Sequence, residues 1–206
     1  SLYLLGECYG VLKDHAKAEV AYAKALPALN GADGAEARYR LGLTRFILEK
    51  YVEALADFQT YLGTTAKGRG NKKSGKPGEM QAPRLAQARL YAGRCLIEIE
   101  EYDKARHQFL VLMQDKGDTG AHAHLWHARV FSRRGKYDEA ATHLANAVEK
   151  YQRSRHANDL DFDFANALMS GKRTDWKKAT RSGQRWKRAL ELPLRRSPPH
   201  TGARLA

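Results

Sequence analysis

Small and apolar residues recur along the chain in one fixed arrangement. A small residue follows a hydrophobe, an alanine lies twelve positions after the small residue, and an aromatic residue or leucine lies four after that alanine. The small residues are Gly6, Gly42, Gly93 and Ala128, the alanines are Ala18, Ala54, Ala105 and Ala140, and the last positions hold Tyr22, Phe58, Phe109 and Leu144. Since residues three to four apart share a helix face, each copy predicts a helical hairpin. A single hairpin cannot bury its own apolar face, so the four must stack.

The small residues stand where the two helices of a hairpin are expected to cross. A larger side chain there would push the helices beyond the roughly 8–10 Å separation of closely packed pairs. The pattern predicts an all-α fold without β-sheet. The expected helices lie near residues 2–12, 15–27, 35–49, 51–62, 82–99, 102–114, 121–134 and 137–151.

The spacing of these copies resembles the tetratricopeptide repeat (TPR) family, over about residues 2–151. The chain departs from the family pattern in lacking its early tryptophan, a place that Leu2, Arg38, Arg89 and His124 take here, and its closing proline. The resemblance implies antiparallel hairpins stacked in a right-handed superhelix. It also implies a concave groove, lined by the first helix of each hairpin, in which a partner protein binds.

The intervals between the copies predict how the chain is organised. The key alanines are 36, 51 and 35 residues apart, against a family period of about 34, so the middle interval contains an insertion. Residues 64–80 are rich in Gly and Lys, and we expect them to form a flexible basic loop because they contain too little apolar surface to fold. We expect a TPR-like solenoid over 1–151, a degraded repeat or capping helices over 152–192, and a disordered basic tail over 193–206.

The net charge of +13 is concentrated in two segments. Residues 64–84 carry a net charge of +5 and residues 170–206 carry +9, which leaves −1 for the rest of the chain. Such segments favour an anionic surface, which could be nucleic acid, an acidic protein tract or anionic lipid. The residues expected to contact it are Lys67, Arg69, Lys72, Lys73, Lys76, Lys177, Lys178, Arg181, Arg185, Lys187 and Arg188. Trp176 and Trp186 lie among these charges, where they could stack on bases or simply dock a capping helix.

Helical phase and the TPR resemblance together predict which residues line the groove. They are Tyr3, Glu7, Tyr39, Leu43, Phe46, Leu90, Arg94, Ile97, Leu125, Arg129 and Arg133. The groove would pass from aromatic and apolar to basic along the array, which suits a partner segment with a hydrophobic anchor and an acidic end. We therefore expect a non-catalytic scaffold for protein–protein interaction within a larger complex. The alternative is a structural subunit that is anchored by its basic segments to an anionic polymer, either RNA or an acidic cytoskeletal filament.

Other chemistry finds little support in the sequence. The chain has no phosphate-binding loop, nucleophile elbow or His-Glu-x-x-His motif, so we expect neither an enzyme nor a cofactor. His122, His124, His127 and His143 are expected to be structural or surface residues rather than metal ligands. Cys8 and Cys95 occupy equivalent inward-facing places and are expected to be buried thiols, which suits a reducing compartment. We therefore expect an intracellular, cytoplasmic location. No run of residues is apolar enough to span a membrane.

Overall fold

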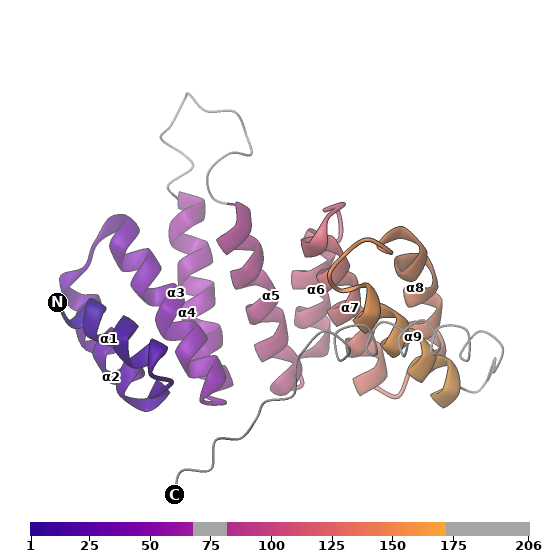
Figure 1. Cartoon of the computed structure of the whole chain (residues 1–206), viewed down its shortest axis with the longest axis horizontal. Helices are drawn as coiled ribbons and strands as arrows, with labels where there is room; N and C mark the ends of the chain where they lie inside the picture. The colour runs from indigo at the N-terminus through magenta and orange to yellow at the C-terminus, as the bar shows by residue number, and fades with distance from the viewer. Residues whose placement is uncertain (68–81, 172–206) are drawn as a thin grey trace, which may run out of the picture. The chain divides into compact units, whose positions relative to one another are not determined.

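The computed structural model describes residues 1–67 and 82–171, and all the regular structure in these ranges is helical. The helices are α1 (Leu2–Val11), α2 (His15–Ala25), α3 (Gly31–Ile47), α4 (Tyr51–Lys67), α5 (Ala82–Glu98), α6 (Tyr102–Leu112), α7 (Asp118–Arg133), α8 (Tyr137–Lys150) and α9 (Ala157–Ser170), with a short 3₁₀ turn at Leu26–Ala28 (Figure 1). The prediction of an all-α helical-repeat fold is confirmed.

The helices belong to two compact units. Unit 1 spans Ser1–Gln114 and consists of the hairpins α1–α2, α3–α4 and α5–α6; α2 packs on α3, and α4 packs on α5. Unit 2 begins at Asp115, and in its described part α7 and α8 form a hairpin on which α9 packs. The continuity of the stack from unit 1 into unit 2 stays a prediction.

All four hairpin turns have the same backbone geometry. One residue in each has a positive φ: Lys13 (59°), Glu49 (60°), Glu100 (62°) and Gly135 (69°). The amide of the next residue donates to the carbonyl oxygen five positions earlier, as from Asp14 to Tyr9 at 3.0 Å and from Lys136 to Phe131 at 2.9 Å. This is the Schellman arrangement, which ends the first helix and satisfies its last carbonyls. In three of the turns the residue in this left-handed region is not a glycine, the residue that usually takes such a conformation. A search of the sequence for glycines would therefore miss these turns.

Gly6, Gly42 and Gly93 lie at the helix crossings of unit 1, directly against aromatic rings. A Cβ atom added at Gly93 would lie 2.5 Å from the ring of Phe109, and one added at Gly42 would lie 3.1 Å from the ring of Phe58. Phe58 and Phe109 are completely buried. The predicted helix crossings, where a glycine meets an aromatic ring, therefore lie in the core of these hairpins.

Two sequence expectations about this fold are wrong. Helix α4 continues to Lys67, so the first residues of the expected loop 64–80 are helical; the rest of that loop lies outside the described residues. Cys8 is exposed, although Cys95 at the equivalent place is fully buried. The difference arises because α5 is covered by α4, whereas no described helix packs on that side of α1. Of the expected region 152–192, helix α9 is described, and the tail 193–206 lies outside the described residues.

Candidate functional site

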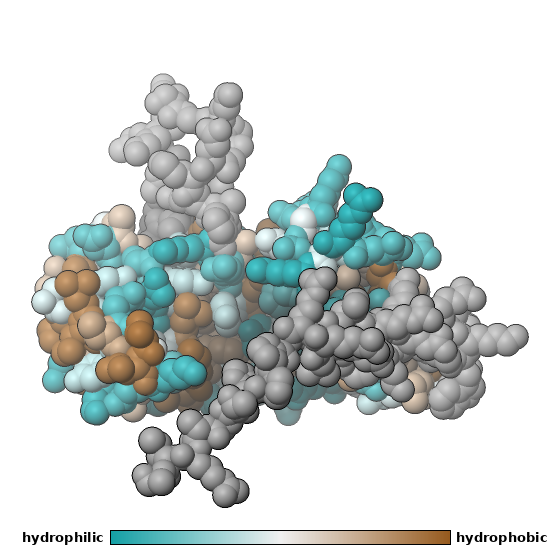
Figure 2. Space-filling view, viewed as in Figure 1, coloured by the Kyte–Doolittle hydropathy of each residue, from teal (hydrophilic) through white to brown (hydrophobic). Residues whose placement is uncertain are grey.

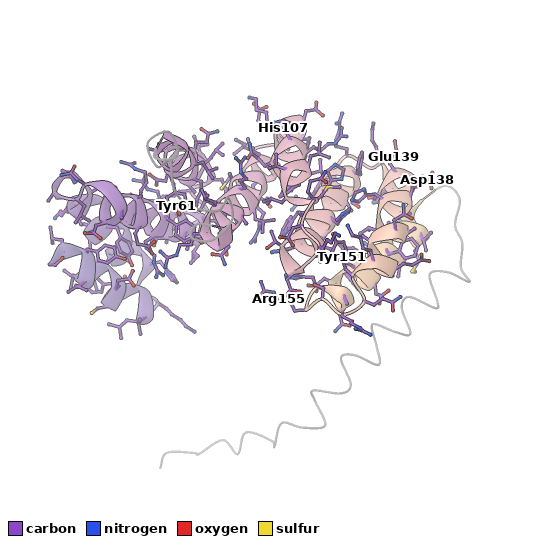
Figure 3. The ribbon with its side chains drawn as sticks, turned by 90° about the horizontal axis from the view of Figure 1, so that it is seen from above. Tyr61, His107, Asp138, Glu139, Tyr151 and Arg155 are labelled. Carbon is purple, nitrogen blue, oxygen red and sulfur yellow. The ribbon has the colours of Figure 1, made fainter. Side chains whose placement is uncertain are left out.

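In α3, α5 and α7, the residues that correspond in the repeat to Tyr3 of α1 lie in the core rather than in a groove. Tyr39, Leu90 and Leu125 are at most 6% exposed, and Ile97 is also buried. The ring of Tyr39 packs 5.4 Å from that of Tyr61, which Figure 3 labels, and its hydroxyl donates to Gln87 Oε1 at 2.9 Å. The prediction that these four residues line an open groove is wrong, because they face the second helix and the neighbouring hairpin.

The partly exposed face of α3 and α5 is shifted by one residue from the predicted phase. This face holds the residues of α3 and α5 that correspond in the repeat to residues 4, 7 and 11 of α1. We call it the inner-helix face. Its members are Arg40, Leu43 and Ile47 on α3 and Tyr91, Arg94 and Glu98 on α5. Leu43 and Arg94, which were predicted, are partly exposed on this face, whereas Arg40 and Tyr91 were not among the predicted residues. Each of them is a polar or amphipathic residue that directly follows a buried one, Tyr39 or Leu90. This pattern in the sequence could have identified them.

An aromatic–arginine cluster joins α3 to α5 at this face. It consists of Phe46, Tyr91 and Arg94, all partly exposed. The rings of Phe46 and Tyr91 lie 5.1 Å apart, edge to face, and the Arg94 guanidinium lies 4.5 Å from the Phe46 ring centre and 5.2 Å from that of Tyr91. Stacking of this kind holds the arginine in place. The cluster places two partly exposed aromatic residues and one cation side by side.

The cluster rests on a rigid base. The ring of Tyr91 stacks on that of the fully buried Phe58 at 5.7 Å, and the ring of Tyr51 meets that of Phe46 at 5.6 Å. Both partners lie on α4, so three helices fix the positions of the two exposed rings. A binding surface that is held in this way loses little conformational entropy when it meets a partner.

The charged side chains near α1 form ion pairs with one another. Arg40 Nε lies 3.5 Å from Glu7 Oε1 and 3.0 Å from Glu36 Oε1, and Arg84 also pairs with Glu36. The buried Tyr22 hydroxyl donates to Glu7, and burial, with Glu7 second, raises the pKa of Tyr22. These groups neutralise one another, so Glu7 has a structural role. Tyr3 packs against the ring of Tyr22 at 5.8 Å.

The predicted basic end of the groove belongs to unit 2. Arg129 and Arg133 lie on α7 in unit 2. Arg129 Nε lies 2.6 Å from Asp163 Oδ2 of α9, and its guanidinium also covers the ring of Trp126 at 4.7 Å. Arg129 therefore links α7 to α9, whereas Arg133 is exposed.

The histidines of unit 2 pack between α7 and α8. His124 Nδ1 and His143 Nε2 are 3.1 Å apart, and the rings of His127 and His143 lie 4.5 Å apart. His127 is 4% exposed. Across residues 1–67 and 82–171, no group of three or more His, Cys, Asp and Glu side chains is arranged to hold a metal ion. These rings lie at the packed contact between α7 and α8. The buried Tyr151, labelled in Figure 3, closes the same region by donating to the Asp115 carbonyl at 2.8 Å.

The basic residues expected to contact an anionic surface cannot be placed. Lys67 ends α4, but its side chain is outside the described set, and the other ten residues lie in 68–81 or 172–206. Within the described ranges, no helix has the length and apolar character needed to cross a membrane.

Comparison with known proteins places the chain among all-α helical-repeat proteins. Residues 122–154, which contain most of the α7–α8 hairpin, match a family model for the tetratricopeptide repeat. The structure resembles that of apo RapI (TM-score 0.76, 15% identity), with 93% of this chain and 53% of RapI covered, so the chain spans about half of RapI. No curated protein sequence matches the chain.

Two further solved structures have the same fold. The TPR-like repeats of a putative kinesin light chain from Podospora anserina match with a TM-score of 0.71 and 13% identity over 95% of both chains. The Rap conjugation gene regulator of plasmid pLS20, solved with the Phr* peptide, matches with a TM-score of 0.63 and 15% identity over 93% of this chain and 53% of the regulator. At these identities the likeness establishes the fold. Together with the family match at 122–154, it confirms the resemblance to TPR proteins.

Proposed function

We propose that this chain is a non-catalytic scaffold that binds a segment of a partner protein on the inner-helix face of unit 1. The observation that supports this most directly is the aromatic–arginine cluster of Phe46, Tyr91 and Arg94. Two partly exposed rings and a stacked cation offer an apolar anchor beside a carboxylate-binding group. Aromatic residues and arginine are the types that most often dominate binding energy at protein interfaces.

The chemistry of the face defines the class of partner. Leu43 and Ile47 extend the apolar surface along α3, while the charges of Arg40, Glu7 and Glu36 are paired. A partner segment with an aromatic or aliphatic anchor next to Asp or Glu fits this arrangement. The pLS20 regulator, which has a similar fold, was solved with a peptide, and this supports a peptide-sized ligand for this chain too.

Selection from a library of displayed random peptides tests the proposal. We expect the immobilised chain to enrich peptides that combine an aromatic residue with Asp or Glu. Arg94→Ser should reduce their binding by about tenfold or more, since a charge-assisted contact contributes roughly 1.5–3 kcal/mol. The matched control is Lys104→Ser, which removes an exposed cation from α6. Unfolding midpoints of both variants must match that of the parent chain. If no such peptide is enriched, or if both variants bind equally well, the proposed site is wrong.

A second candidate rests on the distribution of charge in the sequence. Residues 64–84 and 170–206 carry net charges of +5 and +9, which favours a structural subunit bound to an anionic polymer. Binding of this kind weakens steeply as salt rises. Replacing Lys72, Lys73 and Lys76 with Ser should lower the affinity for a model RNA and flatten its salt dependence. If the chain does not bind RNA at low salt, or if the triple variant binds it as the parent does, this second candidate is wrong for RNA.

A further inference from the structure

The peptide bond between Asn30 and Gly31, at the start of α3, joins two residues that are adjacent in this order only once in the chain. The other asparagines, none of which precedes a glycine, are Asn71, Asn146, Asn158 and Asn166. Asparagine is among the chemically labile residues of proteins, because the backbone nitrogen of the next residue can attack its side-chain amide. A following glycine leaves that nitrogen most accessible, since glycine has no Cβ and its backbone rotates freely. The sequence thus singles out Asn30 for this chemistry.

The structure leaves this pair of residues open to reaction. Asn30 is exposed and is the N-cap residue of α3, with φ −126° and ψ 166°, and among the described residues its side chain forms no capping hydrogen bond. Gly31 is also exposed and has a φ of +58°, and a Cβ built on it would meet no described atom within 4 Å. Neither a cap nor close packing therefore prevents the side chain and the backbone from rotating towards each other.

The start of a helix also favours the attacking form of the nitrogen. The first amides of a helix have no carbonyl partner within that helix, and the Gly31 amide is the first of α3. Attack requires that this nitrogen lose its proton and that negative charge develop on the side-chain oxygen of Asn30. The positive end of the α3 macrodipole stabilises the negative charge at both atoms, and Asp33 in the same turn offsets part of this effect.

We propose that Asn30 is a site of spontaneous deamidation in the folded chain. The Gly31 nitrogen bonds to Asn30 Cγ, the Cγ–Nδ2 bond breaks, and the amide leaves as ammonia with the proton from Gly31. Water then opens the five-membered imide at one of its two carbonyl carbons, which gives aspartate or isoaspartate. Water reaches the bond because both residues are exposed, and Figure 2 shows hydrophilic surface beside apolar surface over this end of unit 1. The reaction does not depend on the proposed binding function.

The two products affect α3 differently. Aspartate keeps the main chain unchanged and is as good an N-cap residue as asparagine. Isoaspartate adds a carbon to the main chain and turns the former Asn30 carbonyl into a free carboxylate. That carbonyl accepts a hydrogen bond from the Gly34 amide at 3.3 Å, and a Cβ added at Gly34 would lie 2.7 Å from the Leu29 carbonyl oxygen, so the turn is tight. The isoaspartyl product should therefore loosen the start of α3, which packs on α2.

Peptide mapping by mass spectrometry of the full chain, incubated folded and in urea, tests the site. We expect Asn30 to convert in the folded chain at a rate less than about tenfold below its rate in urea, because no local unfolding has to come first. The rate should rise with pH, since the nitrogen must lose its proton. Asn146 and Asn166, which lie within α8 and α9 before the buried Ala147 and Ala167, should convert far more slowly.

The matched control places the same pair of residues inside a helix. Leu62→Asn puts an asparagine before the exposed Gly63 of α4, where reaction requires the helix to open, so folding should slow it by at least about tenfold relative to urea. The proposal is overturned if folding slows Asn30 by about tenfold or more, if it slows the control no more than Asn30, or if Asn30 reacts no faster than Asn146.

Separating the products by chromatography tests the effect on α3. The isoaspartyl fraction should unfold at a lower urea concentration than the Asn30→Asp chain, which contains the other product. Asn30→Ser, which keeps a good N-cap residue but lacks the amide, should give neither product at this position and should keep its urea midpoint during the same incubation. Equal midpoints for the isoaspartyl fraction and the Asn30→Asp chain would overturn the inferred loosening of α3.

Discussion

The second hairpin, α3–α4, and the fourth, α7–α8, place different chemistry at the same pair of positions. In the second hairpin Arg38 Nη1 lies 3.3 Å from Asp57 Oδ1; in the fourth, His124 Nδ1 lies 3.1 Å from His143 Nε2. Both pairs join the first helix of a hairpin to its second helix at equal distances from the crossing. The repeat spacing therefore determines which positions meet, while the sequence chooses whether an ion pair or two imidazoles meet there.

At the helix crossings of the two hairpins, both the small residue on the first helix and its partner on the second helix differ. Gly42 faces the ring of Phe58, whereas Ala128 shares a core cluster with Leu144. A glycine without Cβ makes room for a flat ring, and a leucine leaves room for the methyl group of an alanine. The two positions must therefore change together. This explains why the single departure from glycine among the four crossings coincides with the single departure from an aromatic partner.

Removing Asp57 should have the largest effect. Asp57 is 3% exposed and pairs with Arg38 and also with Arg45, whose Nη1 lies 2.8 Å from its Oδ2. Burial raises the pKa of Asp57, while the two arginines act to lower it. Asp57→Ala would leave both guanidinium groups without this partner, and we expect a loss of about 3 kcal/mol in the free energy of unfolding. Urea denaturation measures this loss; Asp103→Ala, at an exposed position on α6, should cost far less.

Overfilling a crossing should have the next largest effect. In Gly42→Leu the new side chain meets Phe58 and Asp57, and a Cβ alone would lie 3.1 Å from the ring. We expect a loss of about 2 kcal/mol, typical of overpacked cores. Gly63→Leu is the control, since no atom lies within 4 Å of a Cβ added there. An unchanged urea midpoint for Gly42→Leu would show that the crossing yields more easily than the geometry indicates.

Exchanging both members of a crossing tests the matching rule directly. A Cβ at Gly93 would lie 2.5 Å from the ring of Phe109, so Gly93→Ala alone should cost about 1–2 kcal/mol. Phe109→Leu alone should also destabilise, because it leaves a cavity. The double variant reproduces the pair found at Ala128 and Leu144, and its loss should be smaller than the sum by about 1 kcal/mol. Simple additivity in urea denaturation would contradict the matching of the two positions.

Much of the fold could be predicted from the spacing of small and apolar residues. The crossing glycines and alanines located each hairpin because close packing of helices tolerates few residue types. Exposure was harder to predict, since it depends on neighbouring helices as well as on the residue's own helix. Cys8 and Cys95 have the same place in the pattern, yet only Cys95 is covered. The phase of the inner-helix face was wrong by one residue at Tyr39 and Leu90 for the same reason.

Polar contacts between hairpins were not predictable from the repeat pattern. Glu19 of α2 pairs with Arg45 of α3 at 3.1 Å and with Lys50 in the following turn at 2.7 Å. Each charge alone resembles an ordinary residue on a solvated helix face, and no periodicity records which of them will meet. The aromatic–arginine cluster is similar, because Phe46 of α3 and Arg94 of α5 are 48 positions apart and meet only when these two helices have packed.

The imidazole pair predicts that unit 2 is more sensitive to acid than unit 1. A hydrogen bond between His124 and His143 needs one donor and one acceptor nitrogen, and protonation of both rings would place two cations 3.1 Å apart. His127 adds a third ring 4.5 Å from His143, and Tyr151 lies on the other side, 5.4 Å from His124. Since the folded state disfavours the extra protons, its stability should fall as pH drops through the range in which histidine titrates. Helices α3 and α4 contain no histidine.

Amide hydrogen exchange, corrected for the intrinsic effect of pH, can follow the two hairpins in one chain. Between about pH 7 and about pH 5.5, α7 and α8 should lose about 1 kcal/mol of protection, while α3 and α4 change little. The double variant His124→Arg/His143→Asp installs the chemistry of the second hairpin in the fourth and should remove most of the acid sensitivity. Equal loss of protection in both hairpins, or undiminished acid sensitivity in the double variant, would show that the imidazole pair is not its source. The equivalent positions would then differ in chemistry without differing in their response to pH.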